Sequence, residues 1–431
     1  MSLSSDQPRP AAYRWLVFAL LSLAYLLVYF HRTSPAVVAK DIMRDLQAGE
    51  ALLGVLASAY FYPYALMQIP AGLLSDSWGP RRTITVFFLL AGAASIFFGL
   101  AESVATATAA RVLVGLGVSM LFVPTIKVLT RWFRLREFSF MMGLLMAVGG
   151  LGVLGAASPL AYLSAALGWR GSFLAIGGIT LALALAIWFL VRNSPEEMGL
   201  PPAEAPVAGS STAPAIGLMA GIKMVAGQPR FWPVAVWFFC TSGMFFSFVG
   251  LWGGPFLQDV YGLSKPQAGG VLSMAAVGMI LGSPALSWIS DRLLNSRKKV
   301  MIGSSALVML LVLPLAFWPR VFNLPGLYVW CLLFSVFTSS VVVIGFTTAK
   351  ELFPVSIAGT ATGLVNLFPF LGGAVLQPVL GLILEHQEKV NGIHDAAGYG
   401  RAFLVYVLAA ALALAASTLL KETLAPRRAG S

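Results

Sequence analysis

Twelve stretches of mostly apolar residues, each about as long as a membrane crossing, constrain the fold of this chain more than any other feature. A helix needs about 20 apolar residues to cross the roughly 30 Å hydrocarbon core of a bilayer. Within that core each segment must satisfy its own backbone hydrogen bonds, which favours helices. The sequence therefore predicts an all-α integral membrane protein with twelve transmembrane helices, at residues 14–38, 50–75, 83–101, 104–130, 139–162, 171–191, 231–257, 266–290, 300–318, 325–349, 356–384 and 402–420.

The composition agrees with a membrane environment. Hydrophobic residues make up 58% of the chain and charged residues 10%, against about 25% charged in soluble domains. Most of the 28 Lys and Arg residues lie in the alternate loops that share a side with the N-terminus, as the positive-inside rule requires of cytoplasmic segments. We therefore expect a multi-pass protein of the bacterial inner membrane, with both termini in the cytoplasm, lipid around it and no nucleic-acid partner.

A polar segment divides the chain into two groups of six spans. Residues 192–230 are rich in Pro, Gly, Ser and acidic residues, which bury little surface and favour a linker. The expected units are an N-terminal six-helix bundle (1–191), a cytoplasmic linker (192–230) with a short surface helix at 215–227, and a C-terminal six-helix bundle (231–431). Paired halves of six spans with a solute path between them are typical of transporters.

Each half also carries a related sequence after its second span. It reads GLLSDSWGPRR at 72–82 and SWISDRLLNSRKK at 287–299, with Ser-Asp at a helix end and basic residues a few positions later. The carboxylate can pair with such basic residues in one conformation only, as a latch, with Asp76 facing Arg81 and Arg82 and with Asp291 in the second copy. The alternative is a solvated turn whose arginines only set the topology.

These sequences carry a resemblance to a known family. The first loop resembles the signature between spans 2 and 3 of the major facilitator superfamily at Gly72, Asp76, Gly79, Arg81 and Arg82. Asp291 with residues 297–299 resembles its weaker second copy, and the run RVLVGLG resembles the span-4 motif of the superfamily at Arg111, Gly115 and Gly117. The resemblance covers nearly the whole chain and implies the major facilitator fold of two six-helix bundles.

An arginine inside the first span is the strongest functional signal. The stretch LLVYFHRTSPAVV (26–38) places His31 and Arg32 within the membrane, where an ionisable residue usually faces the bundle interior, although an arginine can also snorkel outward. Its guanidinium binds carboxylates or phosphates bidentately and stays protonated. The segment YFHRTSPAVVA resembles span 1 of the anion:cation symporter branch, in which an arginine at this position contacts the substrate carboxylate. The resemblance implies that Arg32 binds an anion.

The chain departs from that branch at the residues that usually carry protons. The branch often has an aspartate where this chain has His31, and an acidic residue in span 4 where this chain reads GVSMLF at 117–122. No carboxylate occupies the middle of any predicted span. His31 is therefore the leading candidate for a proton carrier, because imidazole titrates near neutral pH. That His31 only orients Arg32 through a hydrogen bond stays open.

The second span contributes three polar side chains to one helix face. Tyr60, Tyr64 and Gln68 recur at i, i+4 and i+8, so they share that face. They are candidates for lining a solute path. The alternative is that the tyrosines pack between helices with their hydroxyls satisfied locally.

The remaining candidates are single residues on other spans. Lys127 either adds a second cation to the solute site or snorkels to the cytoplasm, and Arg111 is expected to have a structural or coupling role. The C-terminal half offers Trp252, Asn366 and Gln377 as cavity residues. Core packing is the alternative for the tryptophan, and hydrogen bonds between helices are the alternative for the two amides.

The function predicted from these residues is secondary active transport of a small organic anion, a carboxylate, by alternating access with proton coupling. Cations within spans favour an anionic solute, and no nucleotide-binding GxxxxGK[ST] motif is present. We expect no enzyme, cofactor or metal, because no span carries a paired carboxylate, a Cys-His arrangement or a metal-ligand set. The expected partners are the solute and the coupling ion, and the expected state is a monomer.

Two other functions remain open. The main alternative is a proton-coupled exporter of drugs or hydrophobic metabolites, which a cavity with one polar anchor and aromatic walls would favour. The other is a transporter-shaped sensor that moves nothing. The short tails and loops argue against a sensor, because they leave no extra domain for signalling.

Overall fold

Twelve helical crossings build the molecule. A computed structural model describes residues 10–201, 218–353, 355–390 and 393–424. Within these residues, ten helical segments are long and apolar enough to span a membrane, and the bent pair Glu50–Leu66 and Pro70–Ser77 adds an eleventh. One segment, Phe140–Leu190, has 51 residues and divides at Gly168, whose φ of +69° ends one helix and begins the next. It therefore makes two crossings, and the predicted twelve are confirmed.

The first six crossings are α1 to α10, and several of them are broken at proline. Pro35 begins α2 directly after the end of α1, because proline offers no backbone N–H to a continuing helix. The bounds are α1 Pro10–Thr33, α2 Pro35–Leu46, α3 Glu50–Ser58, α4 Phe61–Leu66, α5 Gln68–Ser77, α6 Pro80–Gly99, α7 Val104–Ser119, α8 Phe122–Trp132, α9 Leu135–Ala156 and α10 Ser158–Leu190.

The second six crossings are α12 to α20, of which two are interrupted by a π-helical turn and a third ends in one. The bounds are α12 Phe231–Ser247, η2 Phe248–Trp252, α13 Gly253–Tyr261, α14 Lys265–Trp288, η3 Ile289–Leu293, α15 Arg297–Phe317, α16 Leu324–Ser335, η4 Val336–Ser340, α17 Val342–Glu351, α18 Val355–Val365, α19 Leu367–Glu385 and α20 Ala396–Leu419. A two-stranded antiparallel hairpin, β1 Lys389–Val390 and β2 Ile393–His394, joins α19 to α20.

The predicted linker contains two short helices. η1 Pro195–Met198 follows α10, and α11 Leu218–Ala226 precedes α12. α11 falls within the short surface helix predicted at 215–227, of which residues 215–217 lie outside the described residues. The bundle limits at 191 and 231 stay a prediction.

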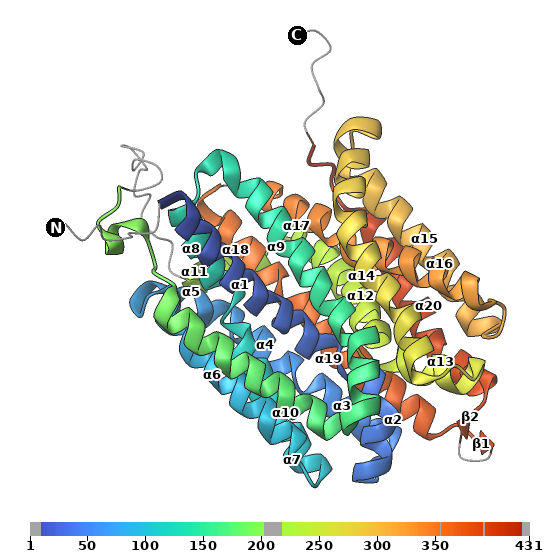
Figure 1. Ribbon diagram of the computed structural model, residues 1–431. Helices are drawn as coiled ribbons and strands as arrows, with labels where there is room; N and C mark the ends of the chain where they lie inside the picture. The colour runs from blue at the N-terminus through green and yellow to red at the C-terminus, as the bar shows by residue number, and fades with distance from the viewer. Residues whose placement is uncertain (1–9, 202–217, 354, 391–392, 425–431) are drawn as a thin grey trace.

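The two six-helix bundles lie side by side along most of their length (Figure 1). α3 packs on α19, α2 on α13, and α9 on α14. Gly254 allows one of these contacts, because a Cβ there would lie 1.8 Å from the backbone oxygen of Ala36 in the other bundle. The backbones of the two bundles are thus in direct contact where α13 crosses α2.

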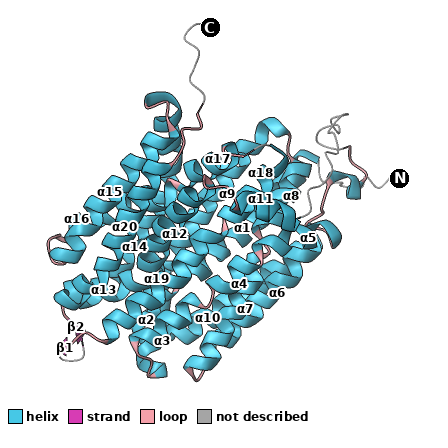
Figure 2. Cartoon of the chain, turned by 180° about the vertical axis from the view of Figure 1, so that it is seen from behind, coloured by secondary structure: helices cyan, strands magenta, loops and turns pink. Residues whose placement is uncertain are grey.

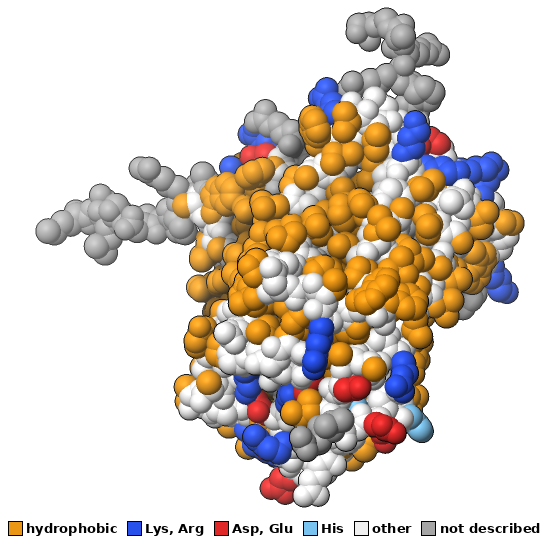
Figure 3. Space-filling model, turned by 90° about the vertical axis from the view of Figure 1, so that its right-hand side faces the viewer, with side chains coloured by type: hydrophobic (Ala, Val, Ile, Leu, Met, Phe, Trp, Pro, Cys, Tyr) orange, Lys and Arg blue, Asp and Glu red, His pale blue; other side chains and the backbone are white. Residues whose placement is uncertain are grey.

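The molecule has two distinct ends, which we name by the predicted orientation. The cytoplasmic end holds α5, α8, α17 and α18, and the outer end holds α2, α13 and the β hairpin (Figure 2). On the face shown in Figure 3, hydrophobic side chains form a broad belt, and charged side chains gather towards the two ends. This is the distribution expected of a bilayer-spanning protein.

Candidate functional site

Arg32 lies at the centre of the molecule, between the two bundles. It is the penultimate residue of α1 and its side chain is only 4% exposed. Four aromatic rings surround its guanidinium carbon, two from each bundle: Tyr29 at 4.6 Å, Tyr64 at 4.8 Å, Phe370 at 5.0 Å and Phe246 at 5.3 Å. We call Arg32 and these four rings the ring cage. Arg32 points inward and does not snorkel, so the inward-facing alternative is the one that the structure adopts.

The cage provides aromatic faces instead of a counter-charge. Among the described residues no Asp or Glu forms an ion pair with Arg32, and its Nε is buried without a hydrogen-bond partner. Cation–π contacts stabilise a buried guanidinium by about 0.5–2 kcal/mol each, which is less than a carboxylate partner supplies in a desolvated site. The buried guanidinium of Arg32 is therefore left without a full counter-charge among the described residues.

A thin layer of residues from both bundles closes the cytoplasmic side of Arg32. The rings of Tyr64 and Phe370 lie 4.3 Å apart between centroids. One step further along, the Nδ2 of Asn366 donates to the Oε1 of Gln68 at 3.0 Å. We call these four residues the inner barrier. It brings three of the predicted site residues together across the two bundles.

Arg111 and Tyr60 lie deeper in the N-terminal bundle. The guanidinium of Arg111 stacks on the Tyr60 ring at 5.0 Å and donates to the backbone oxygen of His31 at 2.8 Å. The Tyr60 hydroxyl donates to the backbone oxygen of Val28. Arg111 thus holds α7 against the end of α1, which is a structural role, and a coupling role stays a prediction.

The ring of His31 points away from the guanidinium of Arg32. It is fully buried, and its Nε2 lies 3.4 Å from Thr180 Oγ1 on α10, within the same bundle. The adjacent side chain of Arg32 instead faces the C-terminal bundle. The hydrogen bond that would let His31 orient Arg32 is therefore not formed between their side chains in this structure.

Trp252 and Gln377 form contacts between helices of the C-terminal bundle. The indole N–H of Trp252 donates to the backbone oxygen of Gln377 at 2.9 Å, and the side-chain amide of Gln377 donates to the backbone oxygen of Phe246 at 2.9 Å. Both residues are buried. The structure gives them the packing and hydrogen-bonding roles that were the alternatives to lining a cavity, although Gln377 fixes the backbone of a cage residue.

Lys127 requires a correction to two predictions. Its ammonium binds the carboxylate of Asp76 and the backbone oxygen of Ser75, so it faces the C-terminal end of α5 and not the ring cage. Within the described residues neither Arg81 nor Arg82 pairs with Asp76. Arg81 instead stacks on Trp188 and donates to the backbone oxygen of Val191. The sequence could not show this, because the lysine comes from a different crossing than the loop.

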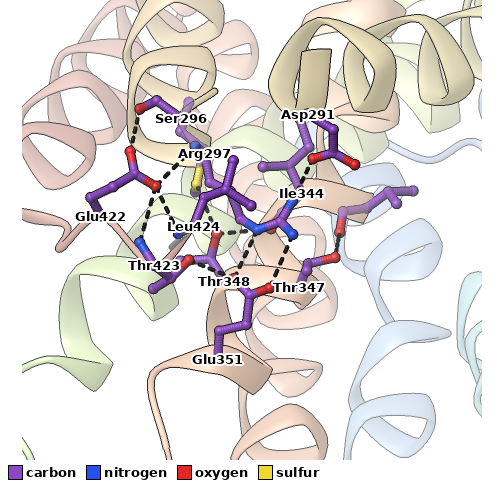
Figure 4. A network of polar contacts seen from close by, with 12 residues as sticks. Asp291, Ser296, Arg297, Ile344, Thr347, Thr348, Glu351, Glu422, Thr423 and Leu424 are labelled. Carbon is purple, nitrogen blue, oxygen red and sulfur yellow. Dashed lines mark hydrogen bonds and ion pairs between the residues drawn. The ribbon is translucent and has the colours of Figure 1, made fainter. Parts of the chain in front are cut away.

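The second copy of the loop is held by a larger network (Figure 4). Arg297 donates to both oxygens of Glu351, at 2.8 and 3.0 Å, and to Asp291 at 3.2 Å. The segment after α20 binds at the same place: the Glu422 carboxylate accepts hydrogen bonds from Ser296 and from the backbone N–H of Arg297. Asp291 therefore pairs with a basic residue of its own loop, as predicted.

The outer end holds charged residues that sequence reasoning missed. They join the two bundles by ion pairs between residues far apart in the chain, namely Lys40–Asp259, Asp41–Lys265 and Glu50–Lys389, and by a hydrogen bond between His394 Nε2 and the Glu50 carboxylate at 3.0 Å. The Glu385 carboxylate also accepts from the backbone N–H of Ala51, at the N-terminus of α3. We call this set the outer contact. Its only sequence signal is that opposite charges recur just beyond span ends, which does not reveal their partners.

The fold and the buried arginine define a two-bundle membrane transport protein, and the comparisons with known proteins agree. A family model described as Major Facilitator Superfamily matches residues 21–377, and the chain belongs to this family. It is accordingly a transporter-class protein and not an enzyme.

Individual relatives are distant but similar over most of their length. A probable sulfoacetate transporter of Cupriavidus necator is 24% identical over 394 residues, with 86% of this chain and 87% of the relative covered. A D-galactonate transporter of Escherichia coli is 24% identical over 446 residues, covering 97% and 98%. A crystal structure of a bacterial homolog of the human lysosomal transporter Spinster matches with a TM-score of 0.76 at 18% identity, covering 96% and 98%, which supports the fold.

Proposed function

We propose that this protein is a secondary active transporter that moves a small organic anion, a carboxylate, across the membrane with proton coupling. The observation that carries the proposal is the buried guanidinium of Arg32, which lies between the bundles without a described carboxylate partner. A charge buried without a counter-ion is costly, and an anionic solute would supply one. The names of the relatives, which include sulfoacetate and galactonate transporters, support an anion.

The proposed mechanism is alternating access between two bundles, residues 1–191 and 231–431, that rock about Arg32. The outer contact joins the bundles by several ion pairs, whereas the inner barrier consists of one ring contact and one amide hydrogen bond. Separating the inner barrier would expose Arg32 to the cytoplasmic side, and separating the outer contact would expose it to the other side. We place the protein as a monomer in the bacterial inner membrane, with both termini in the cytoplasm.

Proton coupling is the finer part of the proposal. His31 remains the proposed carrier because it is a buried titratable group one residue from Arg32. Since its ring contacts α10, a proton there would act on the packing within the N-terminal bundle and not directly on the solute. A change in the packing of α1 would then make the binding of the anion and of the proton cooperative.

An exporter of hydrophobic compounds is the second candidate function, and one observation favours it. The ring cage is the single polar anchor with aromatic walls that such an exporter would need. A neutral solute, however, would leave the buried guanidinium without a counter-charge. We therefore prefer an anion.

Replacing Arg32 by lysine tests the proposal. A point-charge ammonium does not reproduce the planar fork of a guanidinium, so Arg32→Lys should reduce carboxylate uptake into proteoliposomes by at least about tenfold, the loss of roughly one charge-assisted hydrogen bond. The thermal midpoint should change little. Arg44→Lys, at an arginine whose side chain is 74% exposed, is the matched control. Near-normal uptake by Arg32→Lys would show that Arg32 does not bind the solute.

A further inference from the structure

The walls around Arg32 consist mainly of aromatic faces and offer few hydrogen-bonding groups. Besides the guanidinium, the only polar atoms that the ring cage itself contributes are the hydroxyls of Tyr29 and Tyr64. The other two walls are phenyl rings, which stack on each other with centroids 6.0 Å apart. Phe61 extends this surface, since its ring lies 5.2 Å from that of Phe246.

Most polar side-chain groups next to the cage already have partners, although the Oε1 of Gln377 is buried without one. The Gln68 amide donates to the backbone oxygen of Tyr64 and accepts from Asn366. The Gln377 amide nitrogen donates to the backbone oxygen of Phe246, and the Tyr60 hydroxyl donates to that of Val28. A solute hydroxyl would have to compete with each of these bonds, and two of them hold the backbone of the cage residues Tyr64 and Phe246 in place.

We propose that the solute is an organic acid with an apolar or aromatic body and few hydroxyl groups, its anionic group on Arg32 and its body against Phe246 and Phe370. The inference rests on the proposed function, since it assumes that Arg32 binds an anion, and it adds the chemical class of the remainder. Burying a hydroxyl without a partner is unfavourable, whereas an apolar body gains contact with aromatic faces.

A binding experiment with three related compounds tests the proposal on the full-length protein in lipid nanodiscs. The probes are cyclohexanecarboxylate, the polyhydroxy acid gluconate, and the neutral cyclohexanecarboxamide, each titrated by isothermal calorimetry. We expect cyclohexanecarboxylate to bind at least about tenfold more tightly than the other two compounds. Gluconate lacks the apolar body that would contact the rings, and the carboxamide lacks the charge that would bind Arg32.

The outcomes separate the two proposals. If gluconate binds as tightly as cyclohexanecarboxylate, the apolar-body inference is wrong and the anion site stands. If the carboxamide binds as tightly as the carboxylate, the anion site is wrong and the exporter of hydrophobic compounds is favoured. If none of the three binds at millimolar concentration, both proposals fail.

Variants of the cage provide a second measurement. Phe370→Asn should lower the affinity for cyclohexanecarboxylate and raise that for gluconate, because it replaces a ring by hydrogen-bonding groups. Phe246→Leu keeps the wall apolar and should preserve the order of the two acids. Phe334→Leu, at a buried phenyl that contacts Phe248 and Trp330, is the control and should leave both affinities unchanged. An unchanged preference in a folded Phe370→Asn protein would overturn the assignment of the body to this wall.

Discussion

The two related loops, one in each bundle, are built very differently. In the N-terminal bundle, Asp76 has a side chain that is 72% exposed and pairs with a single lysine, Lys127. In the C-terminal bundle, Arg297 is only 12% exposed and binds Asp291 and both oxygens of Glu351. An exposed single pair contributes about 0–1 kcal/mol, whereas bidentate, partly buried pairs are stronger. We therefore expect the charge pair of the N-terminal loop to separate more easily than that of the C-terminal loop.

A common feature of both bundles makes the difference more informative. In each bundle, a residue that follows the sixth crossing accepts a hydrogen bond from the loop between the second and third crossings. The side chain of Asn193, after α10, accepts from the backbone N–H of Arg81, and Glu422, after α20, accepts from that of Arg297. Similar local sequences thus occupy similar places, but the number and burial of the charge pairs differ. We therefore expect matched substitutions in the two loops to have unequal effects.

The largest expected effect is that of Arg297→Gln. The change leaves the carboxylates of Asp291 and Glu351 without their shared partner, so we expect the protein to lose on the order of 2 kcal/mol of stability. The thermal midpoint in detergent measures this loss. Arg82→Gln, at an exposed arginine of the other loop, is the matched control and should shift the midpoint little. Equal shifts would show that the two loops contribute alike.

Asp76→Asn should have a smaller effect, and on rate instead of stability. Losing one exposed pair changes the balance between conformations by at most about 1 kcal/mol, or about fivefold in rate. We expect slower uptake with unchanged solute affinity, because Asp76 lies at the cytoplasmic end and Arg32 at the centre. Uptake kinetics and equilibrium binding on the same preparation separate the two quantities. A weaker affinity at an unchanged rate would contradict this prediction.

Lys127→Gln should reproduce the effect of Asp76→Asn, since the two residues form one pair. The double variant should then be no slower than either single variant, as expected of residues that act only through each other. A loss of solute affinity confined to Lys127→Gln would contradict this prediction.

The smallest expected effect is that of Glu422→Gln. A carboxylate at the N-terminus of a helix stabilises it by about 0.3–1 kcal/mol, and here the helix is α15. Partial burial acts to raise the pKa of Glu422, but hydrogen bonds from Ser296 and the backbone N–H groups of Leu424, Arg297 and Thr423 outweigh it and lower the pKa below the ordinary value of 4.5.

The lowered pKa sets the pH dependence of that contribution. The folded protein favours the ionised form of Glu422, so its stabilisation is fully present above about pH 4.5 and is lost as the pH falls through the lowered value. The difference in thermal midpoint between the unchanged protein and Glu422→Gln should therefore persist at pH 7 and shrink in acid below pH 4.5. A difference that grows in acid would show that another group is responsible.

The sequence by itself determined the features that depend on one segment at a time. The twelve crossings follow from the length of apolar runs, because each membrane helix satisfies its own backbone. Arg32 was identifiable for the same reason, since a charge within a span must have a polar partner or a function. The resemblance of the loop at 72–82 to the superfamily signature likewise needed no knowledge of the structure, and the family match confirmed it.

The tertiary structure alone decided which residues meet. The Tyr64 ring contacts that of Phe370, Gln68 accepts a hydrogen bond from Asn366, and Glu50 is hydrogen-bonded to His394. Helical periodicity places a residue on a face of its own helix, but it does not say which helix of the other bundle lies opposite. Asp76 shows why the sequence is not sufficient. The arginines of the following loop are nearest to it in sequence, but Lys127 of α8 binds it, because α5 packs on α8. Partners between segments depend on how the helices dock, and docking is set by the whole packed surface.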